Sequence, residues 1–198
     1  MSKTQQVLDY AREKGIITAK DIESKGIHRQ YIKRLEQQGL LIHSARGIYT
    51  FSDAEITESH TLAETAKRVP SGVVCLLSAL SFYELTTQAP FEVWLAIPHK
   101  HRPPKDNLLP LRIVYMSGQS LEEGIENHLI EGVNVRVYSL AKTVVDCFKF
   151  RNKVTLEVAL EALRECWRER RCSMDELWHY AKICRVHNVM RPYLESLT

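Results

Sequence analysis

The side chains whose types and spacing could do chemistry are concentrated in residues 28–38. This segment has helical periodicity, and at 100° per residue its apolar centre falls between Tyr31 and Ile32, with Leu35 beside them. The opposite face consists of polar residues, namely Arg29, Gln30, Lys33 and Gln37, with Arg34 at its margin. Arginine and lysine can donate to guanine or to phosphate, and glutamine can pair with adenine. The composition therefore suits a helix that lies in the major groove of DNA.

The elements around this segment are predicted to follow helix-turn-helix order. Periodicity and capping residues predict a helix over residues 5–14, a short helix between Thr18 and Gly26, and a third helix over residues 28–38. Thr18 and Asp21 form a weak version of the capping box at the start of the short helix.

A hairpin is predicted to follow the third helix, with strands over residues 40–43 and 48–51. Arg46, at the tip of this hairpin, could reach the DNA backbone or the minor groove. A solvated helix face followed by a turn is the alternative interpretation. The joint occurrence of a short helix, a turn, a basic helix and a wing favours DNA binding.

Composition and charge point in the same direction. The chain has 198 residues, of which 44% are hydrophobic and 26% are charged, as in ordinary globular proteins. Residues 1–52 contain nine Lys/Arg and five Asp/Glu, a balance of +4, whereas the other 146 residues carry −1. An excess of basic residues in the N-terminal part of an otherwise neutral chain is expected if only that part binds a polyanion.

Membrane and secretory classes are not indicated. No apolar run approaches the roughly 20 residues of a bilayer span, and the start of the chain has no apolar signal core. The five cysteines are odd in number and include no CxxC pair. We therefore expect a soluble cytoplasmic protein whose cysteines are buried thiols.

The rest of the chain predicts mixed structure. Residues 52–55 are a candidate linker, and Pro70–Gly72 is a clear break. Helical patterns occur over residues 57–69, 77–85, 140–150, 155–170, 174–185 and 189–197. Strand patterns occur over residues 91–97, 111–116, 124–130 and 132–138, so the chain is predicted to be helical after residue 138. The predicted fold class is α+β: a winged helix-turn-helix domain over residues 1–52, then a mixed α/β domain over residues 53–198 with a helical C-terminal tail.

Possible ligand sites in this second part are weak. The proline-rich loop over residues 98–105 contains Lys100, His101, Arg102 and Lys105, which could contact phosphate, although simple solvation is the favoured interpretation. The pairs His99/His101 and Cys184/His187 have spacings seen in metal sites. Neither pair has a second pair at a suitable spacing, so we expect no metal and no cofactor.

Catalytic motifs are absent from the sequence as well. Nucleotide-loop, zincin and serine-hydrolase patterns do not occur. The most suggestive polar group is Ser139-x-x-Lys142-x-x-x-Asp146. Its Ser-x-x-Lys spacing also occurs in some acylating hydrolases, but their companion motifs are missing. The favoured interpretation is a helix capped by Ser139 and stabilised by a Lys142–Asp146 ion pair.

Several segments resemble AbiEi-type antitoxins, the regulators of bacterial abortive-infection (type IV) toxin–antitoxin pairs. In the first part these segments are GIITAKDI (15–22), YIKRL (31–35), GLL (39–41) and RGIY (46–49). In the second part they are LSAL (77–80), VWLAIP (93–98), VRVYS (135–139) and KTVVD (142–146). The resemblance covers most of the chain.

The resemblance implies a winged-helix repressor that binds operator repeats upstream of its own operon. It also implies a C-terminal domain that neutralises a nucleotidyltransferase-like toxin without a stable complex. Arg29, Lys33, Arg34 and Arg46 would be DNA contacts, and no catalytic residue is implied. Because a single half-site binds weakly, a homodimer or cooperative binding on DNA is expected.

Two other classes of function remain open from the sequence. Residues 70–198 could act on nucleic acid or a nucleotide, with the front domain as a DNA-targeting module. Alternatively, the chain could be a protein-interaction module in which the basic residues of the N-terminal part are simply exposed to solvent. The first class would need paired acids or a metal cluster, which the sequence does not offer, and the second would lack the salt dependence of phosphate contacts.

Overall fold

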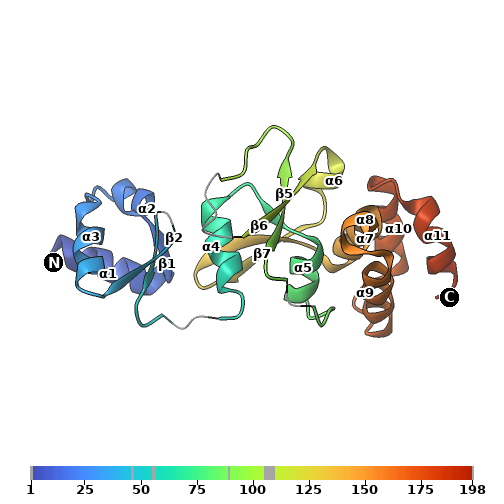
Figure 1. The fold of residues 1–198 in the computed structure, drawn as a ribbon, viewed down its shortest axis with the longest axis horizontal. Coiled ribbons are helices and arrows are strands. Elements are labelled where there is room, and N and C mark those ends of the chain that lie inside the picture. The colour runs from blue at the N-terminus through green and yellow to red at the C-terminus, as the bar shows by residue number, and fades with distance from the viewer. Residues whose placement is uncertain (1, 46, 55–56, 89, 105–109, 198) are drawn as a thin grey trace. The chain divides into compact units, whose positions relative to one another are not determined.

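The structure is a computed structural model that describes residues 2–45, 47–54, 57–88, 90–104 and 110–197. The chain divides into two compact units. Unit 1 contains Met1–Ser71, Pro104–Leu109 and His128–Val135, and unit 2 contains Gly72–Pro103, Pro110–Asn127 and Arg136–Thr198. The predicted α+β fold class is confirmed, because the described chain contains both helices and two sheets (Figure 1).

Unit 1 starts with helix, strand, helix, helix, strand, strand. The elements are α1 (Lys3–Lys14), β1 (Ile16–Thr18), α2 (Ala19–Ser24), α3 (Gln30–Gln37), β2 (Leu41–Ala45) and β3 (Ile48–Phe51). The strands form an antiparallel sheet in the order β1-β3-β2, with Ile17 opposite Tyr49. Sequence reasoning missed β1, because three residues are too few to show a strand period.

Local signals in the sequence explain where these helices begin and end. Thr18 Oγ1 accepts from the Asp21 backbone N–H at 3.1 Å, and Asp21 Oδ2 accepts from the Thr18 N–H at 2.9 Å, so the predicted capping box is confirmed. Gly15 ends α1 with a φ of 66°, and a Cβ there would lie 2.8 Å from the Glu131 carbonyl oxygen. This position therefore requires glycine.

The core of unit 1 holds α1, α2 and α3 together. Its buried apolar members come from all three helices and the sheet, namely Val7, Leu8, Ala11, Ile17, Ile22, Ile27, Ile32, Leu35 and Leu41. Their burial fixes the rotation of each helix about its own axis. The polar face of α3 is thereby turned away from the core.

A polar cluster completes unit 1. Helix α4 (His60–Arg68) starts three residues later than the predicted helix over residues 57–69. Glu131 Oε1 accepts from both the backbone and the hydroxyl of Thr57 at 2.8 Å, and Glu131 Oε2 lies 2.6 Å from His60 Nδ1. Lys67 on α4 pairs with Asp21 on α2 at 2.9 Å. These contacts tie α4 to α2 and to the turn at residue 131.

The second sheet has five strands in the order β6-β5-β4-β8-β7. Its strands are β4 (Val73–Val74), β5 (Val93–Pro98), β6 (Leu111–Met116), β7 (Ile125–Ile130) and β8 (Val133–Tyr138). The strands predicted over residues 91–97 and 111–116 are confirmed, and they pair with each other, with Leu95 opposite Ile113 in parallel register. The β4 strand pairs antiparallel with β5 and parallel with β8, so the sheet is mixed.

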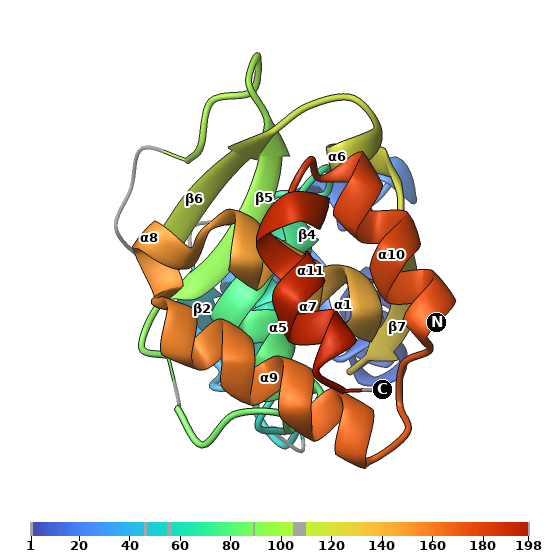
Figure 2. The same ribbon diagram turned by 90° about the vertical axis from the view of Figure 1, so that its right-hand side faces the viewer.

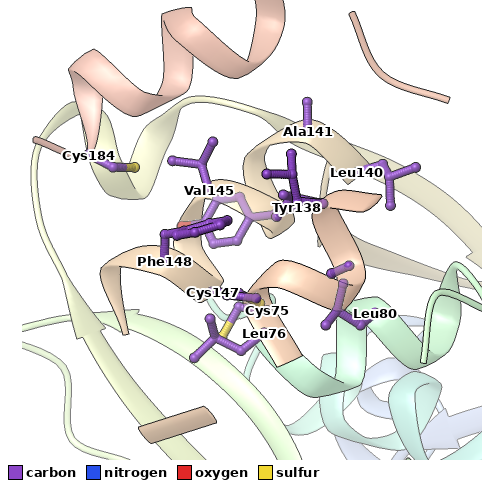
Figure 3. Packing of buried hydrophobic residues seen from close by; sticks show 14 of the residues in the cluster. Cys75, Leu76, Leu80, Tyr138, Leu140, Ala141, Val145, Cys147, Phe148 and Cys184 are labelled. Atoms are coloured by element: carbon purple, nitrogen blue, oxygen red, sulfur yellow. The ribbon is translucent and has the colours of Figure 1, made fainter. Parts of the chain in front are cut away.

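Helices of unit 2 surround a buried central one. They are α5 (Leu76–Phe82), α6 (Gln119–Glu122), α7 (Leu140–Lys149), α8 (Arg151–Val154), α9 (Leu156–Arg168), α10 (Met174–Ile183) and α11 (His187–Glu195). Helix α7 packs against α5, α9 and α10 (Figure 2). Every residue from Leu140 to Phe148 is buried, and Val145 and Phe148 lie in the apolar cluster with Leu76 and Leu80 of α5 (Figure 3).

The predicted Ser139 cap is wrong. Ser139 occupies the N-cap position of α7, but its hydroxyl makes no capping hydrogen bond and is buried without a partner among the described residues. The start of α7 is held instead by Thr143, whose hydroxyl donates to the Tyr138 carbonyl at 3.2 Å and whose N–H donates to the Ser139 carbonyl at 2.8 Å. A side chain inside the first turn thus provides the anchor that we assigned to the cap.

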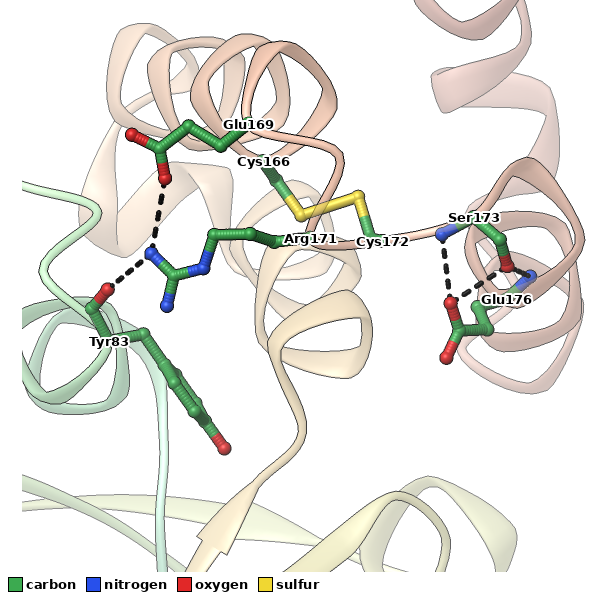
Figure 4. Close-up of a disulfide and its surroundings, with 7 residues drawn as sticks. All are labelled: Tyr83, Cys166, Glu169, Arg171, Cys172, Ser173 and Glu176. Carbon is green, nitrogen blue, oxygen red and sulfur yellow. Dashed lines mark hydrogen bonds and ion pairs between the residues drawn. A yellow bond between two sulfur atoms is a disulfide. The ribbon is translucent and has the colours of Figure 1, made fainter.

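The prediction of five thiols is wrong for two cysteines. Cys166 and Cys172 form a disulfide with Cα atoms 5.9 Å apart, across the turn between α9 and α10 (Figure 4). The turn is closed by Arg171, whose N–H donates to the Cys166 carbonyl at 3.0 Å and whose guanidinium donates to the Tyr83 carbonyl at 2.8 Å. A spacing of six residues carries no signal for this proximity. Cys75, Cys147 and Cys184 are buried thiols, as predicted.

Candidate nucleic-acid interface

Helix α3 has two sharply different sides. Ile32 and Leu35 are 1% and 0% exposed and pack in the core of unit 1. The five predicted contact residues of this region are all exposed, namely Arg29, Gln30, Lys33, Arg34 and Gln37. The structure therefore brings these side chains together on the outer face of α3 and at its start.

The start of α3 differs from the prediction. The helix begins at Gln30, two residues later than expected, and Arg29 occupies the N-cap position. His28 Nδ1 accepts from the Gln30 N–H at 3.2 Å, so the imidazole satisfies one of the N–H groups at the helix start that have no acceptor within the helix. Arg29 nevertheless remains four residues before Lys33 and lies one turn from it.

The cations of α3 are not neutralised by neighbours. Among the described residues, no carboxylate oxygen lies within 4.0 Å of the charged nitrogens of Arg29, Lys33 or Arg34. The Arg34 guanidinium is 5.9 Å from the centre of the Tyr31 ring, which orients it without cancelling its charge. These three exposed cations, one at the N-cap position and two within α3, form a positively charged surface without an ion pair among the described residues.

The other predicted contacts are only partly described. Arg46 lies outside the described residues, as does Lys105. Close to the hairpin tip, the His43 ring stacks on Tyr49 with centroids 4.9 Å apart, and the Gly47 N–H donates to His43 Nε2 at 3.4 Å. Lys100 and Arg102 are exposed in the loop after β5, in unit 2.

The candidate catalytic group of the sequence is inaccessible. Lys142 Nζ and Asp146 Oδ2 are 2.5 Å apart and both side chains are 0% exposed, which confirms the predicted ion pair. Burial raises the pKa of Asp146, although the Lys142 ammonium opposes the shift. Cys184 Sγ donates to the second carboxylate oxygen at 3.3 Å, and burial raises the pKa of this thiol to about 11. The side chains of Lys142 and Asp146 are therefore closed off from solvent.

No group of three or more metal-ligating side chains occurs in the part of the chain that the structure describes. Within the same residues, no helix is both long and apolar enough to cross a bilayer.

Comparison with known proteins bears on the first unit most directly. Residues 5–52 match the family model described as a transcriptional regulator, AbiEi antitoxin, which confirms the resemblance for this segment. The match supports a DNA-binding antitoxin role and is consistent with a regulatory rather than a catalytic protein. No protein with a curated description matches the chain.

A solved structure extends the likeness to most of the fold. The crystal structure of the RV2827C protein from Mycobacterium tuberculosis aligns with a TM-score of 0.61 over 91% of this chain and 71% of that chain. The sequences are 14% identical, so the likeness concerns the fold alone.

Proposed function

We propose that this chain is a DNA-binding transcriptional repressor and the antitoxin of an abortive-infection-type operon, and that residues 1–52 form its winged-helix DNA-binding domain. The observation that carries the proposal is the outer face of α3, where exposed cations have no carboxylate partner among the described residues while the opposite edge is anchored in the core. The family match of residues 5–52 supports the same role.

The chemistry of the contacts follows from their positions on α3. Arg29, Gln30, Lys33 and Gln37 lie on one face, so a major groove about 12 Å wide could receive the helix with these side chains toward the bases. Arg34 lies at the margin of that face, where phosphate is the expected partner. Arg46 is proposed to contact the backbone or minor groove from the hairpin.

The rest of the proposal concerns how the protein regulates its operon and counteracts a toxin. We propose that the chain represses its own operon by binding operator repeats, as a homodimer or cooperatively, because one recognition helix on one half-site binds weakly. Residues 53–198 would form the antitoxin domain, which counteracts a nucleotidyltransferase-like toxin without a stable complex. Such a protein works in the cytoplasm, with the DNA, and needs no cofactor.

The test is a gel-shift titration with duplex DNA from upstream of the gene. Replacing Arg29, Lys33 and Arg34 with Ala should weaken binding more than about 100-fold, since each lost contact is worth roughly 1 kcal/mol or more. A control variant removes the same charge from α1 by replacing Lys3, Arg12 and Lys14 with Ala, and it should lose far less. A loss below tenfold in the α3 variant, with an unchanged circular dichroism spectrum, would refute the groove assignment.

A further inference from the structure

Unit 2 contains a cavity of about 610 Å³ that the proposed DNA-binding function does not use. It lies where four separate segments meet: residue 99 after β5, residues 115–120 from the end of β6 to the start of α6, residues 149–150 at the end of α7, and residues 182–185 at the end of α10. Its volume lies within the roughly 300–1,000 Å³ typical of small-molecule sites.

The lining of this cavity is cationic. Lys149, Lys182 and Arg185 all contribute to it, and no Asp or Glu is among the described lining residues. Lys149 Nζ donates to Ser120 Oγ at 3.1 Å, which fixes the ammonium beside a hydroxyl. Lys182 and Arg185 are exposed and have no ion pair within the described chain. Several cations in one lining that contains no described carboxylate are typical of sites for phosphate groups.

Another part of the lining is aromatic. The rings of His99 and Tyr115 are stacked, with centroids 5.5 Å apart and planes 22° apart. Tyr115 is 41% exposed, so its ring is accessible to a ligand. Phe150 lies beside Lys149 in the same lining. An aromatic surface next to several cations suits a ligand that combines a planar ring with phosphates.

We propose that this cavity binds a nucleoside triphosphate, with the phosphates at Lys149, Lys182 and Arg185 and the base against His99 and Tyr115. Ser117 supplies a hydroxyl that can donate to phosphate or ribose oxygens, whereas the Ser120 hydroxyl already donates to the Ile183 carbonyl at 3.3 Å. Because the described lining offers no carboxylate to hold Mg²⁺, the lysines and the arginine neutralise the phosphates themselves. The inference concerns ligand binding in unit 2 and stands independently of DNA recognition by α3.

The primary test is isothermal titration of the full chain with ATP, and then with GTP, CTP and UTP, at physiological salt. We expect saturable binding that survives EDTA. Replacing Lys182 and Arg185 with Ala should weaken ATP binding about tenfold or more, because two charge-assisted contacts are lost. The matched control replaces Arg164 and Arg168, exposed cations of α9 outside the lining, and should change the affinity less than about twofold.

A second variant tests the base-binding surface. Tyr115→Ala should weaken ATP several-fold and leave the affinity for inorganic triphosphate unchanged, because only ATP has a ring to stack. Absence of saturable binding of any of the four nucleotides at millimolar concentration would overturn the proposal. It would also be overturned if both double variants lost affinity equally, or if the Lys182/Arg185 variant weakened only a single-stranded oligonucleotide, which would indicate a nucleic-acid surface.

Discussion

Helices α3 and α7 each have a lysine one turn away from another charged residue, but the lysine of α3 is exposed and that of α7 is buried in an ion pair. Lys33 of α3 is exposed and unpaired within the described chain, with Arg29 one turn before it. Lys142 of α7 is 0% exposed and is paired with Asp146 one turn after it. The two helices are of similar length, eight and ten residues, so length does not explain the difference.

The explanation lies in the other faces of each helix. Helix α3 is apolar along one edge only, so burial of Ile32 and Leu35 turns its cations outward. Helix α7 packs against α5, α9 and α10 and is buried from Leu140 to Phe148, so any charge within it must be neutralised internally. The same side-chain chemistry therefore provides exposed cations in unit 1 and a buried ion pair in unit 2.

The strongest test of this contrast is Asp146→Ala. The substitution leaves the Lys142 ammonium buried without its partner, and removal of one member of a buried pair costs about 3–5 kcal/mol of unfolding free energy. Urea unfolding of the full chain measures the loss. Glu161→Ala, at an exposed position on α9, is the control and should stay within about 0.5 kcal/mol of the wild type. A loss below 1 kcal/mol for Asp146→Ala would show that the pair contributes little to the core.

Replacing both members of the pair sharpens the same test. Lys142→Met with Asp146→Leu removes both charges and fills similar volumes, so much of the stability lost in Asp146→Ala should return. If the double variant is as unstable as the single one, the cost arises from packing rather than from an unpaired charge.

Glu131 is an intermediate case, with a side chain that is 7% exposed and bound to Thr57 and His60. Burial raises the pKa of Glu131, but the bonds from Thr57 and His60 outweigh it and hold the pKa below its ordinary value. The stabilisation is therefore complete above about pH 4.3 and is lost as the pH falls through the lower folded-state pKa. Glu131→Gln should cost about 1–3 kcal/mol at neutral pH.

The pH dependence separates this effect from a general loss of packing. Between about pH 5 and pH 3, the wild type should lose stability more steeply than Glu131→Gln, because the variant has no carboxylate to protonate there. Thermal unfolding at a series of pH values measures both slopes. Parallel curves would mean that Glu131 has the same pKa in the folded and unfolded chains.

The sequence predicted those features that depend on local periodicity. The outward side of α3, the Thr18 capping box and the Lys142–Asp146 pair all follow from spacings of three or four residues within one helix. It did not predict features that join distant segments. The cavity draws on residues 99 to 185, and the polar bonds of Glu131 lie more than 70 residues away in sequence, so only tertiary packing brings them together.

A sequence-based prediction that fails within a single helix has a local cause as well. Ser139 stands at the start of α7, where a serine normally caps, but a buried hydroxyl there finds no donor among the described residues and Thr143 anchors the turn. Residue type at a helix start predicts a cap only when the side chain is free to turn back toward the first N–H groups.

The smallest expected change in stability belongs to Lys33→Ala on α3. Because the side chain is exposed and unpaired within the described residues, its loss should alter the unfolding free energy by no more than about 0.5 kcal/mol. Its effect on DNA binding should be specific: the slope of log affinity against log salt should become shallower by about one, as expected when one phosphate contact is removed. Lys3→Ala on α1 removes the same charge and should leave the slope unchanged. An unchanged slope for Lys33→Ala would mean that this ammonium meets no phosphate, whereas a stability loss above 1 kcal/mol would mean that its stem packs against the core and that α3 is rotated from the orientation described above.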